Sequence, residues 1–145
     1  MKGIYVLILK IDKEIKTDVG KLGKITFKKA FYAYVGSAMS GIHRLERHLK
    51  NLEKMKVENK HWHIDFLIPY CKRVGWIFAE CYDKIKEQEL AIYLSKNFDY
   101  IKGFGSSDSL APSHLFITPD IKKLKICMIK ALDFINAENF EFFQT

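Results

Sequence analysis

The chain has 145 residues, of which 48% are hydrophobic and 28% are charged, and its formal net charge is +7 at pH 7. This size and composition are typical of one globular domain over residues 1–145, and the lack of any run of about 18 apolar residues argues against a membrane-spanning helix. The positive charge favours contact with nucleic-acid phosphates or anionic surfaces, and a solvated lysine-rich surface is the alternative.

The first two predicted strands are rich in apolar, aromatic and β-branched residues. Residues 3–11, GIYVLILKI, are almost continuously apolar and predict a central strand. Residues 30–36, AFYAYVG, predict a second strand that ends at Gly36. Between them, residues 12–29 are polar and lysine-rich, and the alternating KITF at 24–27 predicts a short edge strand.

Three helices are predicted from apolar residues at helical spacing. The first covers residues 42–53 with Ser40 as its expected N-cap, and the second covers residues 87–97. The third begins at Pro119 with Thr118 as its expected N-cap. The apolar faces consist of Ile42, Leu45, Leu49 and Leu52 in the first, Leu90, Ala91 and Leu94 in the second, and Ile121, Leu124, Met128, Leu132 and Ile135 in the third.

Three further segments complete the predicted sheet. Residues 61–68, HWHIDFLI, alternate between polar and apolar side chains, residues 73–82 are rich in β-formers, and SHLFIT at 113–118 is a short strand. The chain is therefore predicted to be a mixed α/β (α+β) domain, with a small, mostly antiparallel sheet flanked by about three helices.

The cysteines bear on the compartment of the protein. Cys71, Cys81 and Cys127 are odd in number and include no C-x-x-C pair. This argues against a zinc ribbon or a disulfide framework. A reducing compartment, the cytoplasm, is the resulting expectation.

Arginine is used sparingly in this chain. Arg44, Arg47 and Arg73 are the only arginines among 24 basic residues. On the predicted helix, Arg44 lies three positions before Arg47 and four before His48, so these side chains share a side away from the leucine stripe. Because Arg binds phosphate bidentately while Lys is a mobile point charge, the cluster predicts a phosphate-facing surface. A solvated helix face with surface ion pairs is the alternative.

These residues belong to a wider pattern. GIY at 3–5, YVG at 34–36, Arg44 eight residues after the glycine and His48 four residues later resemble the GIY-YIG nuclease superfamily. The rest of the chain resembles one branch of it, small proteins of poorly defined function that are in some cases fused to endonuclease III-like repair enzymes. The segments that carry this second resemblance are VGKLG at 19–23, HWHID at 61–65, ELA at 89–91, GFGSSD at 103–108 and SHLF at 113–116.

The resemblance implies a divalent-metal-dependent endonuclease that hydrolyses phosphodiesters, with DNA as substrate rather than RNA and structure-specific repair as its setting. Tyr5 and Tyr34 match the motif tyrosines and would position or activate water. Arg44 would bind the scissile phosphate, with His48 assisting. Glu87, three residues before a leucine on a helix, matches the glutamate that holds Mg²⁺ or Mn²⁺.

Other roles for these glutamates remain open. Glu89 and Glu80 are the alternatives for the metal ligand. Glu87 is also placed where a first-turn carboxylate complements a helix dipole, which needs no catalytic role.

The HWHID segment offers a second set of polar side chains. His61, His63 and Asp65 would share one face of a strand, because strand side chains alternate with period two. They predict a metal site, a proton relay or part of a nucleic-acid cleft, and the polar side of an exposed sheet is the alternative. The candidates for the nucleic-acid cleft are Arg47, His61, His63, Asp65, Ser107, Asp108 and His114.

The glycine-serine loop at 103–109 is the last candidate site. The sequence also departs from the resemblance at two places. The backbone N–H groups near Gly103 and Gly105 would suit an anion nest, and an ordinary connection is the alternative. Ser109 and Ala111 stand where cysteines often follow the aspartate in the branch, so no cysteine-based metal site is expected. In addition, 28 residues lie between Tyr5 and Tyr34, and this insertion carries Lys13, Lys16, Lys21, Lys24, Lys28 and Lys29.

Two other functions compete with the nuclease hypothesis. A nucleic-acid-binding module on the same fold would bind the phosphate backbone without cleaving it. A metal site of histidines and Asp65 would instead hydrolyse a small phosphoester.

Overall fold

The structure, a computed structural model, describes residues 2–144 and confirms the mixed α+β class. All strand pairs in its six-stranded sheet are antiparallel. The sheet has the order β6 (Asp99–Tyr100), β7 (Leu115–Thr118), β4 (Ala30–Ser37), β1 (Gly3–Ile11), β5 (Lys72–Glu80) and β8 (Glu138–Gln144). A separate ribbon consists of β2 (Ile15–Asp18) and β3 (Lys24–Phe27). The helices are α1 (His43–Lys54), α2 (His63–Leu67), α3 (Ile85–Ser95) and α4 (Ile121–Phe134).

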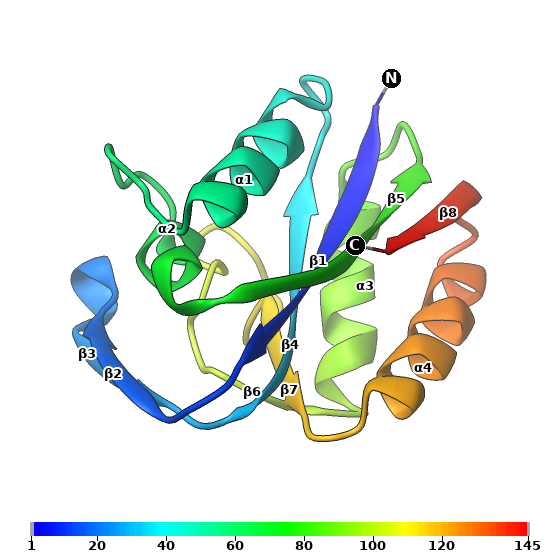
Figure 1. Ribbon diagram of the computed structural model, residues 1–145. Coiled ribbons are helices and arrows are strands. Elements are labelled where there is room, and N and C mark those ends of the chain that lie inside the picture. The colour runs from blue at the N-terminus through cyan, green and yellow to red at the C-terminus, as the bar shows by residue number, and fades with distance from the viewer. Residues whose placement is uncertain (1, 145) are drawn as a thin grey trace.

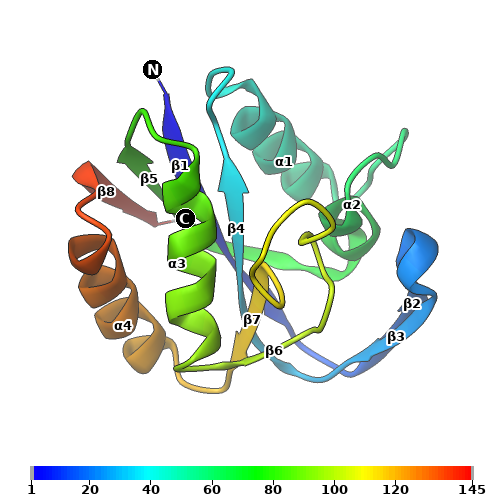
Figure 2. The same cartoon turned by 180° about the vertical axis from the view of Figure 1, so that it is seen from behind.

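The central position of β1 explains its continuous apolar sequence. Its odd-numbered residues, such as Tyr5 and Leu7, are buried against α1, α2 and the ribbon, whereas even-numbered residues, such as Ile4 and Val6, are buried against α3 and α4. Figure 1 shows the sheet running between these two layers, and Figure 2 shows α3 and α4 covering one face. Two separate cores therefore hold the helices at fixed positions around the end of β4.

The helix α1 begins at His43, and the expected N-cap is wrong. Ile42 occupies the cap position and makes no side-chain hydrogen bond there, while Ser40 lies two residues further out. The buried face comprises Leu45, His48 and Leu52. The helix thus places His48 on the side that packs against the sheet.

The largest error of the strand prediction concerns HWHID. Residues 63–67 form α2 because the Asp65 carboxylate accepts hydrogen bonds from the backbone N–H groups of His61 (2.7 Å) and Trp62 (3.0 Å). This local cap favours a helix start over the extended backbone that the alternation suggested. His61, His63 and Asp65 therefore do not share one face of a sheet.

The C-terminal region differs from prediction at two points. Asp120, not Thr118, caps α4, because its carboxylate accepts from the N–H groups of Lys122 (2.9 Å) and Lys123 (3.2 Å). The strand β8 was not predicted; it pairs with β5 and forms one edge of the sheet. None of the helices in the described part of the chain combines the length and the apolar composition that crossing a bilayer requires.

Candidate active site

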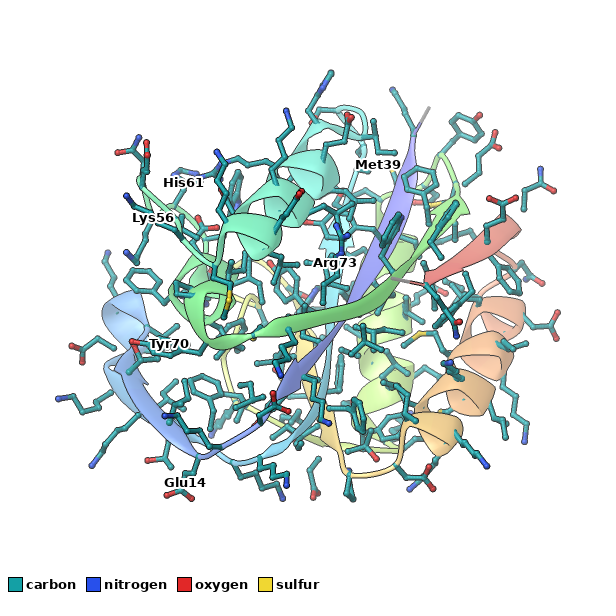
Figure 3. All side chains as sticks on the ribbon, viewed as in Figure 1. Glu14, Met39, Lys56, His61, Tyr70 and Arg73 are labelled. Carbon is teal, nitrogen blue, oxygen red and sulfur yellow. The ribbon has the colours of Figure 1, made fainter. Side chains whose placement is uncertain are left out.

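A cleft of about 640 Å³ opens beside the end of β4, between α1, the first turn of α3 and the glycine-serine loop. Figure 3 labels two residues of its rim, Met39 on the connection after β4 and His61 on the segment before α2. The cleft brings together most of the side chains singled out from the sequence, namely Tyr34, Arg44, His61, His63, Glu87, Ser107, Asp108 and His114. Tyr5, Arg47, His48 and Asp65 do not line it.

The two motif tyrosines occupy the same face of the sheet, as expected. In the antiparallel register of β1 and β4, Tyr5 lies opposite Gly36 and Leu7 lies opposite Tyr34. A Cβ atom at Gly36 would overlap the Tyr5 ring. The glycine of the YVG triplet is therefore required by packing, since it leaves the space in which the Tyr5 ring lies.

Replacing Gly36 by alanine is accordingly expected to destabilise the fold by about 3 kcal/mol, at the upper end of the usual cost of overpacking. Urea unfolding measures this loss. A double-mutant cycle with Tyr5→Leu tests the cause, because a smaller side chain at position 5 should make the Gly36→Ala cost smaller. Equal costs in both backgrounds would contradict the packing role of Gly36.

Arg44 and Arg47 have different surroundings. The Trp62 ring lies close to both guanidinium groups, at 4.6 Å from Arg44 and 4.9 Å from Arg47, as in cation–π contacts. Arg47 also donates to the Asn59 carbonyl (2.8 Å) and lies 3.7 Å from the Asp65 carboxylate. Arg47 is thus tied to the fold, while Arg44 lines the cleft. Trp62 thus helps to hold Arg44.

Glu87 lies in the first turn of α3 and lines the cleft together with Asp108. Burial, followed by the like charge of Asp108, raises the pKa of Glu87 from 4.5 to about 7, although Arg44 and Lys84 partly offset the rise. Sequence reasoning missed Lys84, whose spacing of three residues from Glu87 was the available signal. The alternative ligands are elsewhere: Glu89 is not a lining residue of the cleft, and Glu80 lines a different groove.

The two tyrosine hydroxyls lie in a dry part of the site. Burial, then the nearby Tyr34, raises the pKa of Tyr5 well above its ordinary value, and Arg44 partly offsets the rise. Burial, then Glu87, likewise raises the pKa of Tyr34. Both hydroxyls are therefore protonated at neutral pH. Among residues 2–144, the Tyr5 hydroxyl finds no well-aligned hydrogen-bond partner.

Of the three histidines that line the cleft, His63 and His114 are neutral rings. His63 Nδ1 accepts a hydrogen bond from the Gly105 N–H (2.8 Å), which leaves the proton on Nε2. His114 Nδ1 lies 3.2 Å from the Val35 carbonyl, which can only accept, so the proton is on Nδ1 there. Burial lowers the pKa of both rings.

His48 lies behind the cleft, next to the two tyrosines. His48 is fully buried, and its ring contacts those of Tyr5, Tyr34 and Trp62 edge-on. Burial lowers the pKa of His48 to about 4, against the opposing effect of Asp65. Its Nδ1 lies 3.9 Å from the Asp65 carboxylate, too far for a hydrogen bond, and the two residues do not form an ion pair at neutral pH. His48 thus supports both tyrosines from behind and does not reach the cleft.

The burial of His48 predicts that the free energy of unfolding depends on pH. The unfolded chain would protonate His48 near pH 6.5 and the folded chain only near pH 4, so the free energy of unfolding should fall by up to about 3 kcal/mol as the pH drops through this range. A His48→Phe variant, which keeps an aromatic ring, should lose less stability between these pH values. Urea unfolding at pH 7, 6, 5 and 4 measures both slopes, and equal slopes would contradict the buried neutral histidine.

The glycine-serine loop and the HWHID segment differ in geometry from the anion nest and the shared metal site that were considered from the sequence. The N–H groups of Gly103, Phe104, Gly105 and Ser106 all donate to acceptors within the protein, so this stretch of the loop is no anion nest. The Asp65 carboxylate points inward to its own backbone, away from a shared site with the two histidines of HWHID. Within residues 2–144, no group of three or more His, Cys, Asp or Glu side chains could hold a metal ion.

The cleft nevertheless fits a divalent cation of the magnesium type. Such ions are held by one or two carboxylates, while water and substrate phosphate supply their other ligands. Glu87 and Asp108 are the two carboxylates of the cleft. Burial and then the like charge of Asp108 raise the pKa of Glu87, and a cation bound between the two carboxylates would offset both effects.

Of the comparisons with known proteins, only the one with family models finds a match. No curated protein and no solved structure matches the chain at a significant level. One family model matches residues 4–137, a range that includes every residue of the cleft. The chain therefore belongs to the family described as Domain of unknown function DUF123.

Proposed function

We propose that the protein is a divalent-metal-dependent endonuclease of the GIY-YIG type that hydrolyses phosphodiester bonds in DNA. One observation carries the proposal: Arg44, Glu87 and Tyr34, from three separate elements, line one cleft beside a buried Tyr5. A guanidinium and a carboxylate facing one space match the needs of phosphate hydrolysis, in which one group stabilises phosphate charge and the other holds a cation.

Arg44 would bind the scissile phosphate. Its guanidinium is held by Trp62 (4.6 Å) and is therefore oriented before substrate arrives. Positive charge placed where the negative charge of the transition state develops lowers the barrier without reorganisation.

Glu87 would hold Mg²⁺ or Mn²⁺, with Asp108 beside it. A bound ion of this kind supplies Lewis-acid stabilisation of the phosphate oxygens and lowers the pKa of bound water. Since Tyr5 and Tyr34 are protonated at neutral pH, their hydroxyls would orient the attacking water or donate hydrogen bonds to phosphate oxygens.

Affinity for the rest of the substrate would come from lysines. The segment that contains the β2–β3 ribbon exposes Lys13, Lys16, Lys21, Lys24, Lys28 and Lys29. Contacts of lysine with phosphate are independent of base sequence and weaken as salt increases. The free cysteines suit a reducing compartment, so the cytoplasm is the proposed location.

The test is incubation of purified protein with plasmid, flap and branched DNA, with Mn²⁺, with Mg²⁺ or with EDTA. We expect metal-dependent cleavage, and branched substrates should be cut in preference to plain duplex. Binding of all substrates without cleavage under any metal condition would contradict the proposal and favour the non-cleaving module.

A further inference from the structure

A second groove lies on the α1 side of the sheet, away from the cleft. It has a volume of about 670 Å³ and lies between α1 and the edge formed by β5 and β8. Figure 1 shows that no helix covers β8 on this side, although α4 covers the other. The apolar residues that line the groove are Ile42, Leu45, Leu49, Trp76, Phe78, Phe140 and Phe143. Ile42 and Phe140 are the most exposed of these side chains, whereas Leu45 and Phe78 are buried beneath them.

The charge of this groove opposes that of the whole chain. The charged residues that line it are Glu46, Glu80 and Glu141, all acidic, in a protein of net charge +7. Arg73 extends from β5 on the same side (Figure 3) and lies over the Trp76 ring at 5.7 Å. The groove thus combines an apolar floor with an acidic rim, which suits a partner with apolar side chains among basic ones.

A surface of that description occurs on α4 of the same chain. Ile126 and Ile129 are 58% and 55% exposed and lie on one side of the helix, because they are three residues apart. Lys122, Lys125 and Lys130 flank them, and Asp133, four residues after Ile129, is the one acidic residue on this side. We call the two isoleucines and the three lysines the α4 stripe. Two large apolar side chains surrounded by three lysines complement the apolar groove with its three glutamates.

We propose that the α4 stripe of one copy docks into the apolar groove of a second copy. Within one chain, the groove and the stripe lie on opposite sides of the sheet, so they cannot meet intramolecularly. The contact is therefore heterologous: in a pair, one copy keeps its groove free and the other keeps its stripe free. Copies joined in this way form head-to-tail chains or a closed ring. This inference is independent of the proposed nuclease activity.

Sedimentation velocity over protein concentrations up to about 1 mM tests the proposal directly. We expect the apparent mass to rise above the 17.0 kDa of one chain as concentration increases, and added salt should reduce the rise. A groove variant, Glu46→Lys with Glu141→Lys, and a stripe variant, Ile126→Asp with Ile129→Asp, should each remain monomeric. Glu53→Lys and Leu110→Asp, at exposed positions outside both surfaces, are the matched controls and should associate like the wild type.

A mixture of the two variants provides the sharpest readout. The groove variant retains its stripe and the stripe variant retains its groove, so the mixture should form a dimer that grows no further. A wild type that stays at 17.0 kDa at every concentration would overturn the proposal, even if a basic apolar peptide bound the groove. Continued dimerisation of the stripe variant alone would also overturn it, because that result indicates pairing of two β8 edges.

Discussion

Replacing Arg44 by alanine is expected to reduce the single-turnover rate of DNA cleavage by about 10³-fold or more, because the transition state loses a preorganised positive charge. DNA affinity should change far less, since exposed lysines supply most of the contacts with phosphate. Arg44→Lys should restore little activity, because an ammonium group cannot reproduce the bidentate geometry or the contact with Trp62. Rapid-quench kinetics and fluorescence anisotropy measure the two quantities.

The control for Arg44 is Lys50→Ala on the same helix. Lys50 is exposed and does not line the cleft. Its removal deletes one positive charge from α1 without affecting the proposed site, so the cleavage rate should remain within about twofold of the wild type, as is usual for surface substitutions. Equal losses in both variants would show that Arg44 acts through net charge alone.

Glu87→Gln is expected to have opposite effects on activity and on stability. Metal-dependent cleavage should be lost, because the amide removes the proposed ligand charge. The metal-free fold should instead become more stable at pH 8, by up to about 3 kcal/mol, because the variant no longer holds a partly buried carboxylate whose pKa is raised to about 7. A cleavage assay in Mn²⁺ measures the loss of activity, and thermal unfolding without metal measures the gain in stability; added Mn²⁺ should raise the Tm of the wild type only.

The stability difference between Glu87→Gln and the wild type depends on pH with a defined sign. The folded wild type keeps the Glu87 proton up to about pH 7, whereas the unfolded chain loses it near pH 4.5, so wild-type stability falls relative to the variant between these values. Metal binding should strengthen over the same range as the carboxylate ionises. Glu89→Gln, an exposed position on α3, is the matched control and should change neither property. A stability gain of equal size in both variants would contradict the buried charge at Glu87.

The elements that sequence reasoning placed well are those whose burial leaves a regular apolar pattern in the sequence. β1 is apolar on both faces because it lies at the centre of the sheet, and α1 shows its leucines at helical spacing because one side packs on that sheet. The alternation of HWHID was misleading because a single carboxylate, Asp65, caps a helix start there. β8 escaped prediction because its pairing with β5 joins distant parts of the chain.

Sequence reasoning likewise predicted some residues of the candidate site and misplaced others. Arg44, Tyr34 and Glu87 were singled out by the motif that the sequence resembles, and all three line the cleft. The positions of Arg47 and His48 could not be inferred from the sequence. Helical spacing placed both residues beside Arg44. Tertiary contacts keep them out of the cleft: Arg47 binds the Asn59 carbonyl, and His48 packs against the two tyrosine rings.

The central claim is tested most directly by single-turnover cleavage of a branched DNA in Mn²⁺, with wild type and Arg44→Ala purified side by side. The account predicts 5′-end-labelled fragments of defined length for the wild type, none in EDTA, and at least about a 10³-fold slower appearance for Arg44→Ala. Cleavage at equal rates by both proteins, which would indicate a contaminating nuclease, or no cleavage by either, would contradict it.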